Sequence, residues 1–138
     1  MIEILEIDAS ETWPLRHKVM WPSKLIDFVI LPNDEDGIHY GLFEKEKLVS
    51  VISLFINQNA KEAQFRKFAT DLGFQRKGYG TELLLFLIKE SKKLHVKKLT
   101  CSARISAIEF YKKLEMKVCS DVIIKNGKEY VLMELIFD

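Results

Sequence analysis

The stretch Gln75-Arg76-Lys77-Gly78-Tyr79-Gly80 carries the most information about this chain. A strand-like run, Ala63 to Thr70, precedes it, and a long apolar helical pattern, Thr81 to Leu94, follows it. A turn between a strand and a helix can hold phosphate, because bare backbone N–H groups and the helix dipole favour negative charge there. The two glycines lack a Cβ, so the backbone can approach a ligand closely, and the three residues before them add side-chain donors.

Three phosphate-binding motifs compete for this segment. A Walker A loop requires Lys and then Ser or Thr after its second glycine, and neither residue follows Gly78. A dinucleotide-binding fingerprint requires a third glycine three residues after Gly80, but that position is Leu83. The third motif is a loop for the pyrophosphate of coenzyme A, and Gln75, Gly78 and Gly80 match its spacing.

That third motif resembles motif A of the GNAT superfamily of N-acetyltransferases. Farther along the chain, Ala107 to Leu114 resembles a later helix of the family, in which Ala, two residues, an aromatic residue and Tyr are typical. The resemblance is close from Phe68 to Leu114 and loose from Ile38 to the C-terminus. Two departures stand out: Glu115-Met116 replaces the family's glycine and aromatic residue, and Arg104 replaces its asparagine.

The resemblance implies an N-acetyltransferase that moves an acetyl group from acetyl-CoA to an amine. It implies that Tyr111, with a reference pKa near ~10, protonates the leaving thiolate. The alternative for Tyr111 is a core aromatic residue beside Phe110. The strand end is implied to bind the pantetheine arm and the thioester oxygen through its backbone. The residues expected to bind the coenzyme are Phe68, Ala69, Thr70, Gln75, Arg76, Lys77, Gly78, Tyr79, Gly80, Thr81 and Arg104.

The acceptor is less well defined by the sequence. A protonated amine must lose its proton before it attacks, at a cost of roughly 4–5 kcal/mol at pH 7. His39, Glu44, Glu62 and Asp71 are candidates for the base, but no motif distinguishes one of them, so none is assigned. The irregular segment from Pro22 to Asp36 is expected to form part of the acceptor wall.

Cys101 allows a second route, in which the enzyme itself is acetylated before the acceptor. A small buried cysteine is the commoner situation, and no histidine accompanies Cys101 in the sequence. We therefore expect direct transfer in a ternary complex. A non-catalytic acyl-CoA-binding module and transfer of another acyl group stay open as alternatives.

The composition bounds the other function classes. The 138 residues predict a single domain over 1–138. The net charge of +1 disfavours a dedicated nucleic-acid binder. The scattered Cys101, Cys119 and three histidines show no metal-ligand spacing, so no metal is expected. Neither a signal peptide nor a membrane span is evident, which predicts a cytoplasmic protein without membrane partners; a homodimer stays open.

The hydrophobic pattern predicts the order of the elements. Ile2 to Ile7 is expected as a strand, followed by a helix capped by Ser10 and ended by Pro22. Further strands are expected over 38–44, 47–56, 63–70, 96–101, 117–124 and 129–137, and helices over 78–93 and 106–114. This order predicts an α/β (α+β) fold, a mixed, mostly antiparallel central sheet flanked by helices, with a central β-α-β crossover.

Overall fold

The computed structural model describes residues 1–138 and contains two compact units. Unit 1 consists of Met1–Phe55 and Phe65–Glu90, and unit 2 consists of Ile56–Gln64 and Ser91–Asp138. Strand β4 (Glu62–Thr70) and helix α2 (Tyr79–Lys93) supply residues to both units. The single domain expected from the chain length stays a prediction.

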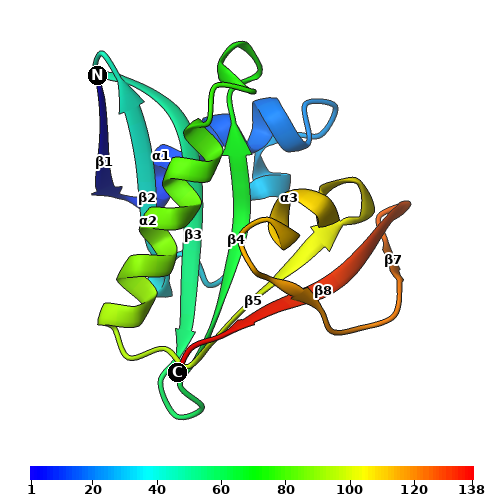
Figure 1. The fold of residues 1–138 in the computed structure, drawn as a ribbon. Coiled ribbons are helices and arrows are strands. Elements are labelled where there is room, and N and C mark those ends of the chain that lie inside the picture. The colour runs from blue at the N-terminus through cyan, green and yellow to red at the C-terminus, as the bar shows by residue number, and fades with distance from the viewer. The chain divides into compact units, whose positions relative to one another are not determined.

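The strands of unit 1 lie side by side in chain order (Figure 1). The first three are antiparallel, with Ile4 opposite Leu42 and His39 opposite Ser53. The tight turn between the second and third confirms the predicted hairpin. These strands are β1 (Ile2–Ile7), β2 (Ile38–Glu44) and β3 (Lys47–Asn57), and β4 follows β3 in the sheet.

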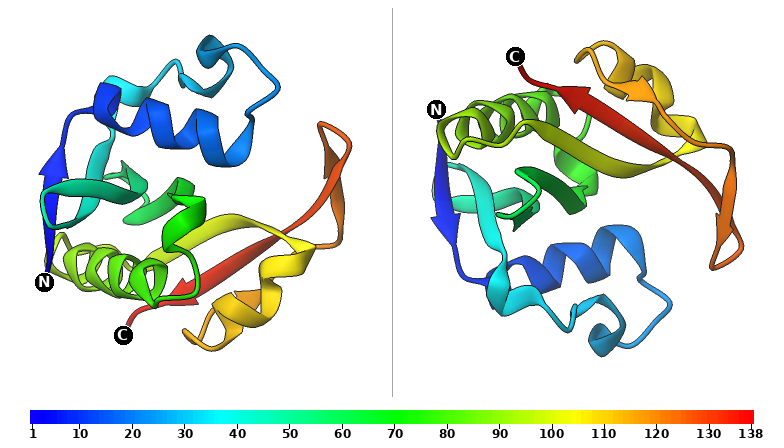
Figure 2. Two further views of the ribbon diagram at one scale, coloured as in Figure 1. Left: turned by 90° about the horizontal axis from the view of Figure 1, so that it is seen from above. Right: turned by 90° about the horizontal axis from the view of Figure 1, so that it is seen from below.

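Helices cover both faces of the strands of unit 1 (Figure 2). Helix α1 (Ala9–Leu15) and the π-helix η1 (Arg16–Met20) lie on one face, where Leu15 packs with Val51 and Ala69. Helix α2 lies on the opposite face, where the ring of Phe86 contacts Tyr40 with centroids 5.3 Å apart. The sheet therefore has two different faces, and the segment after η1 belongs to the α1 side.

Two local predictions in this region need correction or detail. Helix α1 is capped by Asp8 and not by Ser10, because the Glu11 carboxylate accepts the Asp8 backbone N–H at 2.8 Å. The helical stretch ends at Met20, close to the predicted end. The irregular segment after it contains two short 3-10 helices, η2 (Ile26–Val29) and η3 (Asp34–Asp36).

Unit 2 is built around strand β5 (Lys98–Arg104), which runs parallel to β4 and antiparallel to β8 (Lys128–Ile136). The parallel pairs join Glu62–Gln64 to Lys98–Thr100, which confirms the predicted crossover. After β5 come the 3-10 helix η5 (Ile105–Ala107) and helix α3 (Ile108–Lys112).

The single strand predicted over Lys117 to Ile124 is wrong. It is divided into β6 (Lys117–Val118) and β7 (Ile123–Lys125), both of which pair with β8. The Ser120 hydroxyl accepts the Leu132 backbone N–H at 2.8 Å, so a side chain takes the place of a ladder carbonyl there. The Asn126-Gly127 turn is confirmed, since both residues have positive φ angles.

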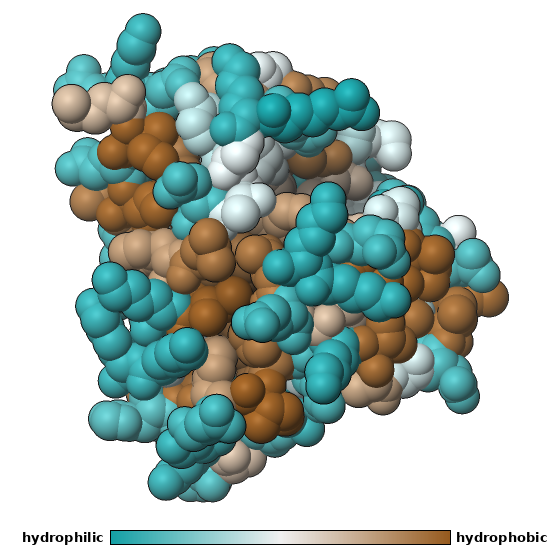
Figure 3. Space-filling model, in the orientation of Figure 1, coloured by the Kyte–Doolittle hydropathy of each residue, from teal (hydrophilic) through white to brown (hydrophobic).

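The observed fold class agrees with the prediction: an eight-stranded, mostly antiparallel sheet flanked by helices. Apolar atoms reach the surface over the arm formed by β7 and β8 (Figure 3), where Val122, Ile123 and Ile124 are exposed. No helix is long and apolar enough to span a membrane. No group of three or more His, Cys, Asp or Glu side chains is arranged to hold a metal ion.

Candidate functional site

The Gln75–Gly80 segment forms an open turn at the start of α2 in unit 1. Arg76 and Gly78 have positive φ angles of 64° and 83°. The first helical hydrogen bond runs from the Glu82 N–H to the Gly78 carbonyl at 3.0 Å. The backbone N–H groups of Tyr79, Gly80 and Thr81 precede that bond, so the helix offers them no acceptor. They are donors available to an anion.

The two glycines of the motif have different physical roles. A Cβ on Gly78 would meet no atom within 4 Å, and the left-handed backbone there disfavours any other residue. A Cβ on Gly80 would lie 3.3 Å from Phe68 and 3.5 Å from the Thr70 hydroxyl. Gly78 therefore keeps the turn open, whereas Gly80 allows the helix to approach β4.

Side chains around the turn hold its shape. The Gln75 amide donates to the Thr70 carbonyl at 2.9 Å, so it ties the turn to the end of β4. The Tyr79 hydroxyl donates to the Glu44 carboxylate at the end of β2. The Phe74 ring lies beneath two ammonium groups, with Lys47 4.9 Å and Lys77 5.3 Å from its centroid.

This cluster brings together the expected coenzyme residues of unit 1 and adds one that the sequence did not indicate. Lys47 lies at the start of β3, far from the motif along the chain. With Arg76 and Lys77, it gives the surroundings of the turn three positive charges that suit a pyrophosphate. In the sequence, the only indication that Lys47 lies near this cluster was its position opposite Glu44 in the predicted hairpin.

Strand β4 is irregular where the pantetheine arm was expected. Lys67 has a φ of 56°, which interrupts the alternation of side chains along the strand. Beyond it, Phe68 and Thr70 face Gly80 of α2, whereas Ala69 packs against Leu15 on the α1 face. The Thr70 carbonyl already accepts the Gln75 amide at 2.9 Å, so this carbonyl is occupied within the protein.

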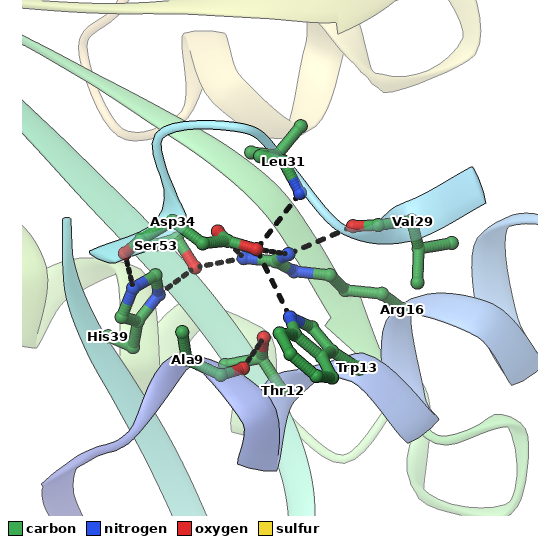
Figure 4. Close-up of polar contacts among 9 residues, drawn as sticks. All are labelled: Ala9, Thr12, Trp13, Arg16, Val29, Leu31, Asp34, His39 and Ser53. Atoms are coloured by element: carbon green, nitrogen blue, oxygen red, sulfur yellow. Dashed lines mark hydrogen bonds and ion pairs between the residues drawn. The ribbon is translucent and has the colours of Figure 1, made fainter. Parts of the chain in front are cut away.

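A buried polar network lies on the α1 side of unit 1 (Figure 4). The fully buried Arg16 donates through both terminal nitrogens to Asp34, at 2.8 and 2.9 Å. The same nitrogens donate to the Val29 carbonyl at 2.9 Å and to the Ser53 hydroxyl at 3.0 Å. Only Arg16 Nε lacks a partner. The network fixes the 22–37 segment to α1 and β3.

The Asp34 carboxylate is correspondingly well supplied with donors. It also accepts the Leu31 N–H at 3.0 Å and the Trp13 indole N–H at 3.1 Å. Burial raises the pKa of Asp34, but the Arg16 hydrogen bonds, the Leu31 N–H and the Arg16 charge outweigh burial and hold that pKa below its usual range.

His39 belongs to the same network and has one consistent tautomer. Its Nε2 lies 2.8 Å from the Asp34 carbonyl, which can only accept, so Nε2 carries the proton. Its Nδ1 lies 2.7 Å from the Ser53 hydroxyl, which then donates to it. Both ring nitrogens are engaged and the residue is 3% exposed, so His39 is a structural residue and a poor base for a substrate.

The other base candidates are also engaged. Asp71 accepts Lys18 at 3.0 Å, and this hydrogen bond is the main cause of its lowered pKa. Glu62 pairs with Lys98 at 3.1 Å, and Glu44 accepts the Tyr79 hydroxyl. The general base stays unassigned among the four candidates.

Unit 2 contains the predicted acid, the cysteine and Arg104. Tyr111 lies on α3 and is 9% exposed, and burial raises its pKa, with a smaller contribution from Cys101. Burial also raises the pKa of Cys101 to about 12. The Arg104 guanidinium lies 5.9 Å from the centroid of the Tyr130 ring. Tyr111 is therefore protonated at neutral pH, and the Cys101 thiolate is scarce.

The end of α3 keeps the geometry that a glycine would give. Glu115 has a φ of 70°, its N–H donates to the Lys112 carbonyl, and the Met116 N–H donates to the Tyr111 carbonyl. This pair of bonds is a Schellman motif with Glu115 at the left-handed position. Glu115 therefore adopts the left-handed backbone that a glycine at this position would adopt, and the helix ends in the same motif.

The comparison with protein families decides the identity. The model described as "Acetyltransferase (GNAT) domain" matches residues 22–137. The chain belongs to the GNAT acetyltransferase family. The match includes the irregular segment after η1, the turn at Gly78 and Tyr111.

Individual relatives agree with this membership. An uncharacterized N-acetyltransferase, YitI of Bacillus subtilis strain 168, is 25% identical over 124 residues, covering 85% of this chain and 83% of YitI. The fold is similar to an IAA acetyltransferase from Bacillus cereus, with a TM-score of 0.82, 19% identity and coverage of 99% and 100%. It is also similar to a Bacillus subtilis acetyltransferase in complex with CoA, with a TM-score of 0.76, 23% identity and coverage of 99% and 97%.

Proposed function

We propose that this protein transfers an acetyl group from acetyl-CoA to an amine. The observation that carries the proposal is the open turn at Gly78, followed by three helix N–H groups without helical acceptors. The family membership and the CoA complex of a structurally similar acetyltransferase support the choice of ligand.

The proposed coenzyme site follows from the groups around that turn. The N–H groups of residues 79–81 meet the pyrophosphate at the positive end of the α2 dipole. Lys47, Arg76 and Lys77 neutralise its charge, and the backbone of Phe68–Thr70 holds the pantetheine arm. The thioester supplies an activated acyl group with a good leaving thiolate.

In the proposed transfer, the neutral amine nitrogen attacks the thioester carbonyl carbon. The C–N bond forms, the C–S bond breaks, and the electron pair leaves with the sulfur. Tyr111, which burial keeps protonated at neutral pH, donates its phenolic proton toward the departing thiolate. The proton lost by the amine leaves through water, since each side chain considered as a base is already engaged.

Direct transfer is favoured over an acetyl-cysteine intermediate. With a pKa of about 12 and 2% exposure, Cys101 is almost entirely a thiol at neutral pH and is shielded from a bulky donor. Replacing Cys101 by Ala should therefore leave most of the activity. Incubation with acetyl-CoA alone should add no acetyl group to the protein by mass spectrometry.

The test combines binding and turnover. Acetyl-CoA at about a hundred times its dissociation constant should stabilise the fold by roughly 3 kcal/mol. Release of free CoA should then depend on an amine supplied from a panel, with sequential kinetics. No calorimetric binding at millimolar acetyl-CoA would refute the proposal. Binding without turnover on any amine would favour the alternative of a non-catalytic acyl-CoA-binding module.

A further inference from the structure

The polar network on the α1 side of unit 1 holds a surplus positive charge. Arg16 and Asp34 form a one-to-one ion pair. Arg66, half-buried on β4, interacts electrostatically with these two residues. Its guanidinium forms no hydrogen bond or ion pair with the protein. Asp34 is bonded to Arg16 and not to Arg66, so the charge of Arg66 has no directly bonded counter-charge.

The backbone of β4 explains why Arg66 faces this network. In a regular strand, Arg66 would point to the same side as Phe68 and Thr70, which face α2. The positive φ of Lys67 interrupts that alternation. Arg66 is therefore directed to the α1 side, which agrees with its electrostatic interaction with Arg16 and Asp34.

This arrangement costs stability unless something neutralises Arg66. Burial and the Arg16 charge both lower the pKa of Arg66, and Asp34 only partly offsets them. A guanidinium remains charged at every ordinary pH, so the protein cannot remove the charge by titration. A half-buried Arg with unused donors is suited to bind a carboxylate or phosphate in two parallel hydrogen bonds.

We infer that Arg66 binds an anionic group of the acceptor, so that the acceptor is an amine which also carries a carboxylate. Arg66 precedes the Phe68–Thr70 segment by two residues on β4. The 22–37 segment, proposed as the acceptor wall, is held by the network that Arg66 faces. The inference rests on the proposed function, which supplies the reaction.

Turnover with matched acceptors tests the inference. The wild type should acetylate L-amino acids better than the corresponding amino acid amides. Arg66→Met, which keeps the apolar stem, should lower kcat/KM on the acids by about 10- to 100-fold, mainly through KM. It should leave the amides and the KM for acetyl-CoA unchanged. Arg66→Lys should recover part of the preference.

Two controls separate this role from other effects. Lys89→Met also removes one positive charge, from the exposed face of α2. It should not change the preference for amino acids over their amides. Comparison of phosphoethanolamine with ethanolamine separates a phosphate-bearing acceptor from a carboxylate-bearing one. A preference confined to the phosphate pair would overturn the carboxylate assignment. If the wild type acetylated acids and amides equally well, the inference about Arg66 would be wrong, but the proposed acetyltransferase function would stand.

Stability provides a readout that needs no turnover. Because the Arg66 and Arg16 charges repel each other, Arg66→Met should raise the melting temperature. A purely structural Arg66 would give the opposite sign. Acetate, compared with chloride at equal ionic strength, should stabilise the wild type and Lys89→Met but not Arg66→Met. The same acetate response in all three proteins would contradict the inference.

Discussion

The turn at Gly78 and the network around Arg16 are both rich in hydrogen-bond donors, yet they use them in opposite ways. At the turn, the N–H groups of residues 79–81 have no acceptor in the helix, and Gly78 leaves open space beside them. In the network, Arg16 is fully buried and donates four hydrogen bonds, all of them to acceptors within the protein. The open donors are the proposed binding site for the coenzyme, whereas the occupied donors stabilise the fold.

The largest effect is expected when the network loses its carboxylate. Asp34→Ala leaves Arg16 buried without a counter-charge and should destabilise the protein by about 3–5 kcal/mol in urea unfolding. Asp36→Ala, at an exposed position of the same 3-10 helix, should have little effect. Similar losses in both variants would mean that the network is not a main support of the fold.

Breaking the turn should harm binding more than folding. Gly78→Val places a branched side chain in a left-handed turn and should weaken acetyl-CoA binding by at least ~10²-fold, with a stability loss of roughly 1–2 kcal/mol. Gly73→Ala is the matched control, since a Cβ there meets nothing within 4 Å and the backbone is not left-handed. Calorimetry measures the affinities, and normal binding by Gly78→Val would show that the turn is not the coenzyme site.

Tyr111 tests whether a buried donor can still serve the reaction. Tyr111→Phe should lower turnover by ~10²-fold while acetyl-CoA affinity stays the same. Because burial raises the pKa of Tyr111, the wild type should show no loss of the acid below pH 10. Turnover equal to the wild type on the best acceptor would make Tyr111 a core aromatic residue only.

The same contrast explains what the sequence could predict. The turn was found because its residues are consecutive and lie between two periodic segments. The hairpin of β2 and β3 and the helix α2 were also predicted correctly, since each has a local hydrophobic pattern. The network was missed because its residues come from five separate elements and meet only in three dimensions; they are Trp13, Arg16, Asp34, His39 and Ser53.

Other failures have equally local causes. The strand predicted over Lys117 to Ile124 was interrupted because the Ser120 side chain captured a ladder N–H, which the apolar pattern does not reveal. The sequence also did not reveal that both ring nitrogens of His39, one of the four unassigned base candidates, have hydrogen-bond partners inside the protein. The direction of Arg66 depends on the left-handed Lys67, for which the sequence gave no sign.

Acid should weaken the network in a defined pH range. The pKa of Asp34 is lower in the folded protein than in the unfolded chain, so the unfolded chain binds its proton first. The stability due to this carboxylate is complete above the unfolded pKa of ~3.9 and is lost as the pH falls through the lower folded value. Urea unfolding from pH 7 down to about pH 2 measures this loss, and Asp34→Asn should show a shallower acid slope than the wild type.

The smallest effect compares two left-handed positions with different purposes. Gly78 has a φ of 83° beside a proposed ligand site, whereas Glu115 has a φ of 70° at the end of α3, where the backbone only closes a helix. Glu115→Gly should therefore stabilise the protein by about 1 kcal/mol, because glycine removes the cost of the left-handed conformation. Lys113→Gly, two residues earlier at a φ of −64°, should instead destabilise it by a similar amount. If Glu115→Gly lowered the melting temperature, the carboxylate of Glu115 would have a stabilising contact that outweighs its backbone strain.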